Sequence, residues 1–301
     1  MIILQLSGGL GNQMFQYALC LALMHTGRDV KIDDVTGYGP QEKLRSPLLR
    51  DVFGIDYVRA GAEEITAITD SYMDLFSRVR RKLTGRKTKL YHEGEPYLFD
   101  PKVMELTEAY LVGCWQSEEY FASVKEEVRA AFQFPADRLG SRSREAAARI
   151  LEAPVPVSVH VRRGDYLNAA DVYGGICTEA YYRGAARHML QKFGSCRFFV
   201  FSNDPAWVKE NIGTLFGEEE GLFVDVMDAN GEQGGWEDMY LISLCRHHII
   251  ANSSFSWWGA WLSGAKDKEI VAPSRFINGY ACPDIFTDGM TRLDENGEID
   301  K

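Results

Sequence analysis

Hydrophobic and polar positions alternate most regularly in the second half of the chain. Short apolar runs there predict strands at residues 155–161, 197–202, 222–227, 248–252 and 269–273. Apolar positions at helical spacing predict helices between them, at 178–193, 236–247 and 255–263. Strands that alternate with helices of this length indicate an α/β fold with a parallel sheet covered on both faces.

Two polar residues mark where helices begin in this half. Thr178 precedes the apolar-periodic stretch 179–193 and is expected to cap that helix. Asp204 is followed by Pro205, and a proline is well tolerated at the first position of a helix, so Asp204 is expected to be a second N-cap.

The first half opens with a strand–helix–strand pattern. A buried strand near the amino terminus leads into the glycine turn "SGGLG", a helix that ends at Gly27, and a second strand at 29–34. Residues 36–110 are less periodic and carry no motif, whereas 117–134 predict one amphipathic helix with Ser117 as its N-cap.

The domain boundary is expected where prolines and charges gather, between residues 135 and 155. We therefore predict two α/β domains, at 1–150 and 151–301.

Polar motifs follow four of the predicted strands. "RRGD" begins at Arg162, "SND" contains Asn203 and Asp204, "NSSFS" begins at Asn252, and "SGGLGNQ" contains Asn12. Ligands of open parallel sheets bind beyond the carboxyl ends of the strands, so these motifs predict a binding site at that edge.

The adjacent cations Arg162 and Arg163 indicate an anionic ligand, because two like charges at this spacing repel unless an anion lies between them. His160 lies two residues before Arg162 and should point to the same face of the strand. Either it contributes to the site, or it is a hydrogen-bonded strand histidine.

The segment "ANSSFSWWGAWL" places polar side chains directly before an apolar helix. Free backbone N–H groups and the helix dipole at such a start suit a phosphate or diphosphate. The expected ligands are Asn252, Ser253, Ser254 and Ser256. The alternative is that Ser254 or Ser256 only caps its own helix. Core packing is expected for Trp257, Trp258 and Trp261.

The glycine-rich turn near the amino terminus, with Gly11 and Asn12, lacks the Gly-Lys-Ser/Thr of a P-loop and the third glycine of a dinucleotide fingerprint. It is either a ligand loop or a tight turn that lets a helix pack close to the sheet.

The charge balance limits the classes of partner. With 33 Lys and Arg against 43 Asp and Glu, the formal net charge is -10, which argues against nucleic acid as a partner. Seven of the twelve residues at 78–89 are nevertheless basic. This segment is either a solvated surface or an attachment to an anionic membrane.

The chain shows no secretory leader, no apolar stretch long enough to cross a bilayer, and six scattered cysteines. We expect a cytoplasmic protein, with peripheral attachment at the inner face of a bacterial membrane as a further hypothesis. The sequence has no Asp-x-Asp and no helical histidine pair with a carboxylate, so no metal ion is expected to hold a diphosphate.

The motifs "GGLGNQMFQYA", "HVRRGDY", "VFSNDPAWV" and "ANSSFSWWGAWL" together resemble those of the bacterial and animal α-1,2-fucosyltransferases, glycosyltransferase family 11. The resemblance implies a GT-B-like fold, two Rossmann-like domains facing across a cleft, with an acceptor side in the first domain and the donor in the second. It implies inverting transfer of L-fucose from GDP-β-L-fucose to the 2-OH of a terminal galactose on a free or lipid-linked glycan, without an essential metal.

The resemblance also assigns roles to single residues. Arg162 would hold the diphosphate, with Arg163 a less critical neighbour and His160 close to the nucleotide. Ser254 would donate to phosphate and Asp238 would contact the guanine nucleoside. In the same way, "SND" would contribute Asp204, and Asn12 would close on the donor from the first domain.

The general base is not assigned by the resemblance, because some α-1,6-fucosyltransferases carry a glutamate at a position that matches this chain near Ala170. Asp165 is the first candidate and Asp171 the second. Asp165 has an alternative role in orienting Arg162 or Arg163. Other classes to separate are a glycosidase, a fucosyltransferase of different linkage, and a non-catalytic protein that binds sugar nucleotides or glycans.

Overall fold

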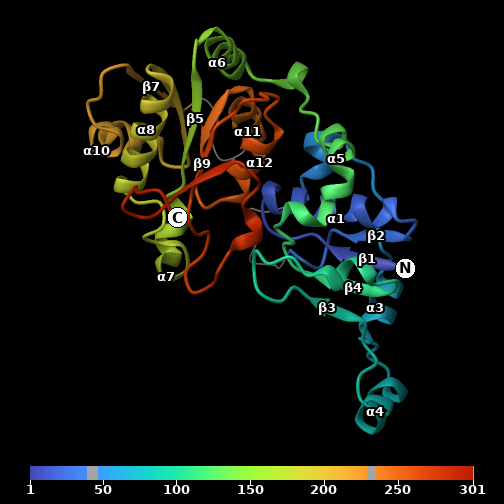
Figure 1. The fold of residues 1–301 in the computed structure, drawn as a ribbon. Coiled ribbons are helices and arrows are strands. Elements are labelled where there is room, and N and C mark those ends of the chain that lie inside the picture. The colour runs from blue at the N-terminus through green and yellow to red at the C-terminus, as the bar shows by residue number, and fades with distance from the viewer. Residues whose placement is uncertain (39–46, 229–234, 301) are drawn as a thin grey trace. The chain divides into compact units, whose positions relative to one another are not determined.

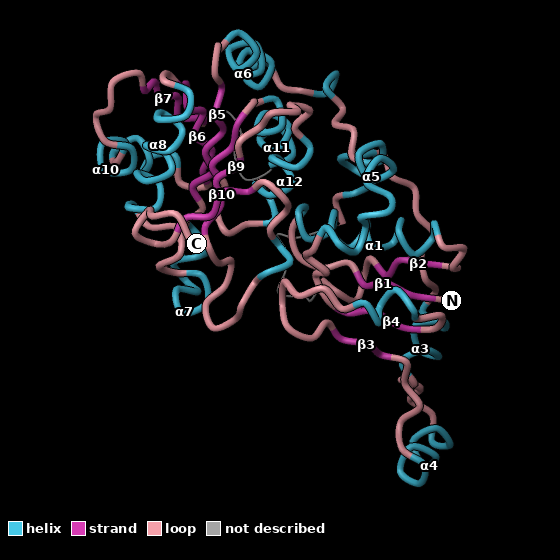
Figure 2. The backbone as a smooth tube through the Cα atoms, in the orientation of Figure 1, coloured by secondary structure: helices cyan, strands magenta, loops and turns pink. Residues whose placement is uncertain are grey.

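The computed structural model describes residues 1–38, 47–228 and 235–300, and it divides the chain into two compact units. The first unit contains Met1–Gln133 and Pro283–Ile285, and the second contains Phe134–Cys282 and Phe286–Lys301. Each unit is built on its own parallel sheet, as Figures 1 and 2 show. The prediction of an α/β protein with two domains, each built on a parallel sheet, is confirmed.

The division falls before α6 (Ser141–Glu152), earlier in the chain than the expected boundary at 150. Ala146 and Ile150 of α6 share a buried cluster with Phe199, Leu241 and Ile242 of the second unit. These contacts bind α6 to the second sheet, so residues 134–150 belong to the second unit and not to the first.

The first unit has a sheet of order β2-β1-β4-β3, in which all paired strands are parallel. Its elements are β1 (Ile2–Gln5), α1 (Leu10–His25), β2 (Val30–Asp33), α2 (Leu49–Phe53), α3 (Ala62–Thr69), α4 (Leu75–Thr84), β3 (Leu90–His92), η1 (Pro101–Glu105), β4 (Ala109–Val112), η2 (Glu118–Val124), α5 (Lys125–Ala131) and η6 (Pro283–Ile285). The strand–helix–strand opening is confirmed, and two of the four strands come from the stretch after residue 36 that shows no clear periodicity.

The single helix predicted over 117–134 is wrong. The segment forms the 3₁₀-helix η2 and then α5, with a non-helical residue at Phe121 (φ -127°, ψ 21°). Ser117 does cap the first of these, accepting a hydrogen bond from the Glu119 N–H. Tyr120 and Phe121 are both buried, and Phe121 lies against Phe15 of α1. The break lets aromatic residues adjacent in sequence both enter the core.

The second unit has a six-stranded parallel sheet of order β10-β9-β8-β5-β6-β7. Its elements are η3 (Ala136–Arg138), α6, β5 (Pro156–Val161), η4 (Gly164–Ala169), α7 (Ala170–Tyr173), α8 (Glu179–Phe193), β6 (Cys196–Ser202), α9 (Pro205–Glu210), α10 (Ile212–Phe216), β7 (Leu222–Met227), α11 (Gly235–Leu244), β8 (His247–Ile249), α12 (Ser254–Leu262), β9 (Ile270–Pro273) and β10 (Met290–Leu293). Both predicted caps are confirmed, since Thr178 accepts from the Tyr181 N–H and Asp204 from the Trp207 N–H.

Helices cover both faces of this sheet. Val157, Val159 and Val161 of β5 pack on one face with Tyr181 and Tyr182 of α8. On the other face, a second buried cluster contains Phe199 and Phe201 of β6 with residues of α6 and α11. Trp257, Trp258 and Trp261 are all buried, so the expected core packing of these three is confirmed. Neighbouring side chains of β6 enter different layers, since Phe198 and Val200 belong to the first cluster and Phe199 and Phe201 to the second.

No helix among the described residues is long and apolar enough to span a membrane.

A buried carboxylate directly before β9 joins that strand to α8 and β10. Glu269, 6% exposed, accepts hydrogen bonds from Lys192 and Thr291 and bonds His188 at 2.8 Å. Burial raises the pKa of Glu269, but the bonds from His188, Lys192 and Thr291 outweigh that effect and lower it to about 2. The charged form of Glu269 therefore stabilises the fold.

Replacing Glu269 by glutamine should lower the free energy of unfolding by about 2 kcal/mol at neutral pH. A depressed pKa in the folded state gives stability that is present above the unfolded pKa and is lost as pH falls towards about 2. Urea unfolding of both proteins should therefore show a difference that is full at neutral pH and shrinks progressively towards about pH 2. A difference that does not change with pH would contradict this role.

Candidate functional site

The polar motifs of the second unit lie together at the carboxyl ends of its central strands. β5 lies between β8 and β6, and all three are parallel, so their carboxyl ends are on the same side of the sheet. The loop after β5 bonds to both neighbours: the Arg163 N–H donates to Asn203 Oδ1 at 3.0 Å, and the Tyr166 hydroxyl donates to the Asn252 carbonyl at 2.8 Å. The predicted gathering of these motifs is confirmed in geometry.

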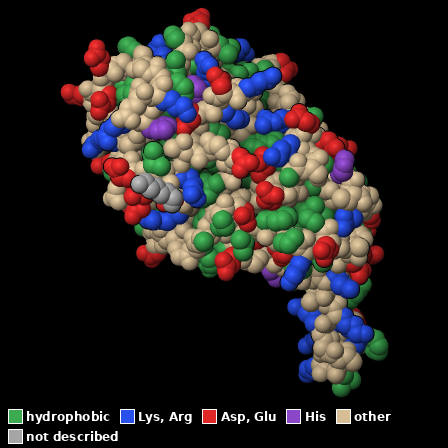
Figure 3. All heavy atoms as spheres, in the orientation of Figure 1, with side chains coloured by type: hydrophobic (Ala, Val, Ile, Leu, Met, Phe, Trp, Pro, Cys, Tyr) green, Lys and Arg blue, Asp and Glu red, His purple; other side chains and the backbone are tan. Residues whose placement is uncertain are grey.

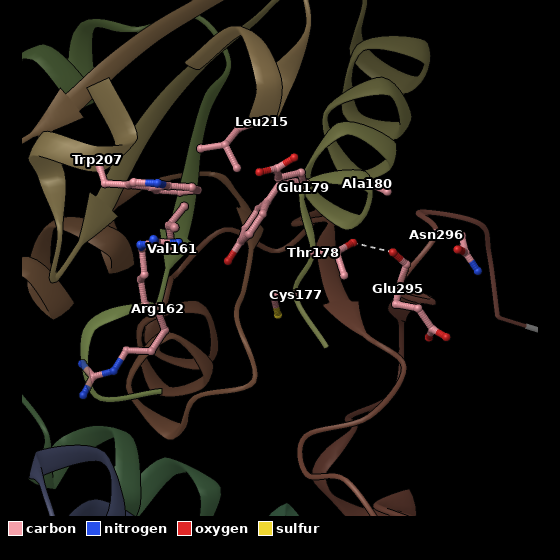
Figure 4. A pocket seen from close by; sticks show the side chains of 12 residues that line it. Val161, Arg162, Cys177, Thr178, Glu179, Ala180, Trp207, Leu215, Glu295 and Asn296 are labelled. Carbon is pink, nitrogen blue, oxygen red and sulfur yellow. Dashed lines mark hydrogen bonds between the residues drawn. The ribbon is translucent and has the colours of Figure 1, made fainter. Parts of the chain in front are cut away.

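Arg162 and His160 lie on one face of the sheet, at the carboxyl end of β5. His160 is 4% exposed, and its ring centroid lies 5.4 Å from that of Phe255 in α12. The guanidinium of Arg162 lies 5.6 Å from the ring centroid of Tyr166. Figure 4 shows the Arg162 side chain extending away from Trp207 and Leu215.

The histidine is held in its neutral form. Burial, and then the nearby charge of Arg162, lower the pKa of His160 to about 3. Its Nδ1 atom is buried and has no hydrogen-bond partner among the residues that the structure describes. A buried polar atom without a partner is unusual in a folded protein, and a ligand can supply the missing bond. His160 therefore suits a hydrogen bond to a ligand and does not suit proton transfer near neutral pH.

Arg163 lies on the other side of β5. Its guanidinium lies 4.1 Å from the ring centroid of Trp207, and its Nε is 3.5 Å from Asp204 Oδ2. Asp204 also caps α9, the helix that carries Trp207. Arg163, Asn203 and Asp204 thus form one cluster with Trp207, and Arg162 is directed elsewhere.

A cavity of about 550 Å³ adjoins this Trp207 cluster. Arg162, Arg163, Cys177, Trp207, Glu295 and Asn296 are among the residues that line it, and Figure 4 shows several of them around the space. Trp207, Glu295 and Asn296 were not predicted as site residues. Trp207 lies inside the motif "VFSNDPAWV", whereas Glu295 and Asn296 come from a distant part of the chain where we recognised no motif.

The loop before α12 uses most of its polar side chains internally. Ser253 caps the helix by accepting from the Phe255 N–H, which is the role we considered for Ser254 or Ser256. Ser256 Oγ accepts from the Ala251 N–H at 3.2 Å, and Asn252 donates to the Phe276 carbonyl at 3.1 Å.

Of the four expected ligands in this loop, Ser254 is the one that is not buried. It stands at the first position of α12.

Asp238 lies in the first turn of α11, close to the same side of the sheet as His160. A Cβ placed on Gly235 would be 3.9 Å from Phe255, which shows how near the start of α11 is to α12. A Cβ on Gly259 would approach Ile242 to 2.4 Å, so only glycine allows these two helices to pack this closely. His160, the first turn of α11 and the start of α12 are thereby gathered around Phe255.

Of the two candidate bases, Asp165 has a side chain that lies outside what the structure describes. Asp171 is exposed in the short helix α7, and its backbone carbonyl accepts a hydrogen bond from Asn278. Neither carboxylate is placed in a catalytic role by these contacts.

In the first unit, Gly11 and Asn12 lie in the first turn of α1, after the glycine turn that follows β1. Gly8 has φ +72°, and a Cβ there would lie 2.6 Å from Asn12 Nδ2, so this turn needs glycine. Asn12 accepts a hydrogen bond from Gln116 at 2.9 Å and approaches Cys114 Sγ at 3.6 Å.

The segment after β4 joins this turn, and we did not predict it as part of a site. Glu93 accepts the backbone N–H groups of Cys114 and Trp115, at 2.7 and 2.9 Å. Burial raises the pKa of Glu93, against the lowering effect of these backbone bonds. Trp115 has φ 55°, a conformation that is costly for a bulky residue. The only signal in the sequence is "GCWQ" directly after a strand that the hydrophobic pattern did not reveal.

Among the residues at 1–38, 47–228 and 235–300, no group of three or more His, Cys, Asp or Glu side chains is arranged to hold a metal ion.

Comparison with known proteins gives consistent matches. The profile of glycosyl transferase family 11 matches residues 100–279. An α-1,2-colitosyltransferase of Escherichia coli is 32% identical over 276 residues, which cover 91% of each chain. Galactoside α-(1,2)-fucosyltransferase 1 of Ateles belzebuth is 29% identical over 273 residues, covering 85% of this chain and 64% of that protein. Arabidopsis thaliana FUT1, solved in complex with GDP, has a TM-score of 0.47 and 13% identity, covering 90% of this chain and 70% of that one.

The close approach of two loops at the carboxyl end of β5 can be tested by adding one methyl group. A Cβ on Gly164 would lie 2.5 Å from Asn203 Nδ2, so Gly164→Ala should displace the Asn203 amide that holds the Arg163 N–H. Losing one such bond and shifting the loop should lower kcat/KM about tenfold, with little change in Tm.

Gly213→Ala is the matched control, because a Cβ there meets nothing within 4 Å. Steady-state kinetics of sugar transfer and thermal melting of both variants make the comparison. Equal activity of the two variants would show that the approach of Gly164 to Asn203 does not matter to the site.

Proposed function

Because the chain belongs to glycosyl transferase family 11 and is therefore a glycosyltransferase, we propose that it transfers L-fucose from GDP-β-L-fucose to the 2-OH of a terminal galactose, with inversion. The observation that carries the proposal is the pairing of Arg162 with the buried, neutral His160 beside the starts of α11 and α12. This combination of a cation, a hydrogen-bonding ring and a helix start suits the paired phosphates of a nucleotide sugar.

The chemistry needs a partner for developing negative charge. When the bond between fucose and GDP breaks, the sugar ring becomes positive and the electrons pass to a phosphate oxygen. An arginine fork and backbone N–H groups that are already in place stabilise that oxygen without rearranging. Arg162 supplies the fork, and the positive end of the α12 dipole, with the Ser254 hydroxyl, adds to the stabilisation.

Other residues have supporting roles in the proposal. Asp238 of α11 would contact the guanine nucleoside, and Gly11 and Asn12 keep the role in donor binding that the family resemblance assigns to them. Arg163, Asn203 and Asp204 would fix the loop after β5 through the Trp207 cluster. Asn252, Ser253 and Ser256 would hold the shape of the loop before α12.

The acceptor hydroxyl must lose a proton as it attacks the sugar. We assign this role to Asp165, with Asp171 as the second candidate, and the alternative that Asp165 orients an arginine stays open. His160 is unsuitable as the base because its pKa is about 3. We further propose that transfer needs no metal ion, since cationic and N–H groups can neutralise the diphosphate. Unchanged activity after dialysis against EDTA is the expected result.

A second donor is favoured by one comparison. The α-1,2-colitosyltransferase at 32% identity indicates colitose, which lacks the 3-hydroxyl of fucose, as an alternative sugar. A site that hydrogen-bonds a hydroxyl discriminates strongly against an analogue without it. The ratio of kcat/KM for GDP-fucose and GDP-colitose therefore separates the two hypotheses.

The function is tested by incubating the purified protein with each donor and a set of β-galactosides, and locating the new linkage. We expect GDP release only when acceptor is present, and an α-1,2 linkage to galactose. Release of monosaccharide from the galactosides without transfer would favour a glycosidase, and tight donor binding with no turnover on any acceptor would favour a non-catalytic binding protein. A different linkage would keep the enzyme class and overturn the acceptor assignment.

In the same assay Arg162→Ala should lower kcat by about 10² to 10³, which is the usual effect of removing one donor to a developing anion. Arg197→Ala is the control, because it removes an exposed guanidinium near the other end of β6 that pairs with Asp225. Folding of both variants is checked by circular dichroism. Full activity of a folded Arg162→Ala protein would rule out the proposed role.

A further inference from the structure

Helix α4 is unusual within the first unit because none of its residues is buried. Leu75, Phe76 and Leu83 are 75%, 79% and 80% exposed, and Val79 is also exposed. Figures 1 and 2 show α4 extended away from the sheet of its unit, and Figure 3 shows basic and hydrophobic side chains together on that projection. A soluble protein rarely leaves four large apolar side chains together in water without a use for them.

The apolar residues form one stripe on the helix. Leu75, Val79 and Leu83 recur every four residues, and Phe76 lies beside them, which together cover about 100° of the helix surface. Arg78 and Lys82, also four residues apart, run along one border of this stripe. Met73, 82% exposed, extends the apolar surface just before the helix.

A buried carboxylate fixes α4 to the chain segments directly before and after it. Asp70 accepts the Lys87 N–H at 2.8 Å and pairs with Arg80 and Arg81, so it ties the chain before α4 to the helix and to the chain after it. Arg81 also donates to the carbonyls of Asp70 and Tyr72. Two of the seven basic residues at 78–89 are therefore used to hold α4 in place.

Four of the other basic residues are directed to solvent. Arg78, Lys82, Arg86 and Lys87 are exposed, and no described carboxylate forms an ion pair with any of them. Lys89 is the exception, because it pairs with Glu108. In a chain with a formal net charge of -10, this is a local positive surface next to an exposed apolar stripe.

We propose that α4 docks in the plane of an anionic lipid bilayer. Leu75, Phe76, Val79 and Leu83 enter the boundary between headgroups and acyl chains, and Arg78 and Lys82 contact headgroup phosphates. Nucleic acid would account for the cations but not for the apolar stripe beside them, and at ten residues α4 is too short to cross a bilayer. Arg86 and Lys87 add positive charge close to the same surface.

The proposal is tested by flotation of the full chain with vesicles of phosphatidylcholine alone or mixed with phosphatidylglycerol. We expect binding to the mixed vesicles, weak binding to phosphatidylcholine, and release at high salt because the headgroup attraction is screened. Leu75→Ser/Leu83→Ser should lower the partition coefficient at least tenfold, and Lys82→Glu several-fold. None of these positions is buried, so Tm and transfer to a free galactoside should stay unchanged, whether or not the proposed donor is correct.

Leu151→Ser and Lys266→Glu are the matched controls, because both positions are exposed in the second unit and the substitutions change the same kinds of side chain. Binding to the vesicles that all variants share equally would place the contact elsewhere and overturn the proposal. The proposal would also be overturned if the wild-type chain self-associates in light scattering, the α4 variants do not, and neither the wild type nor the variants bind vesicles. The apolar stripe would then contact a second copy of the chain.

Discussion

The alternation of side chains along β5 is the constraint on which the candidate site depends. Val157, Val159 and Val161 enter the layer covered by α8, whereas Ser158 bonds His248 and His160 lies against Phe255 of α12. This division continues past the end of the strand, so two adjacent arginines are directed to different surroundings. Arg163 is held by Trp207 and Asp204, and Arg162 stays beside His160. Their repulsion is reduced by separation and by a carboxylate that serves only one of them.

The electrostatics of the site follow from burial. A protonated His160 would add a second charge next to Arg162 in a region with little water, and both burial and that charge keep the ring neutral. Positive charge at this point is therefore concentrated in one side chain, next to the partial positive charge at the start of α12. The chain as a whole is acidic, so attraction for an anionic donor must be local. The same principle applies to α4, where a small basic surface stands out from an acidic protein.

Sequence patterns predicted the features that are local. The caps Thr178 and Asp204, the strand–helix order of the second unit and the polar ends of its strands all follow from periodicity and capping rules. Features that depend on contacts distant in sequence were missed. The break at Phe121 arises because aromatic residues must reach α1, and the assignment of α6 to the second unit depends on Phe199 and Leu241. Glu93 organises the segment after β4 through backbone bonds that leave no trace in composition.

The claim that Arg162 and His160 hold the phosphates of a guanine nucleotide is tested most directly by a crystal structure of the protein with GDP. We predict a phosphate oxygen within hydrogen-bond distance of the Arg162 guanidinium, and a ligand atom or ordered water at His160 Nδ1, the atom that now has no partner among the described residues. GDP bound against Trp207 with no phosphate near Arg162, or held through a divalent cation with Arg162 turned away, would contradict the account.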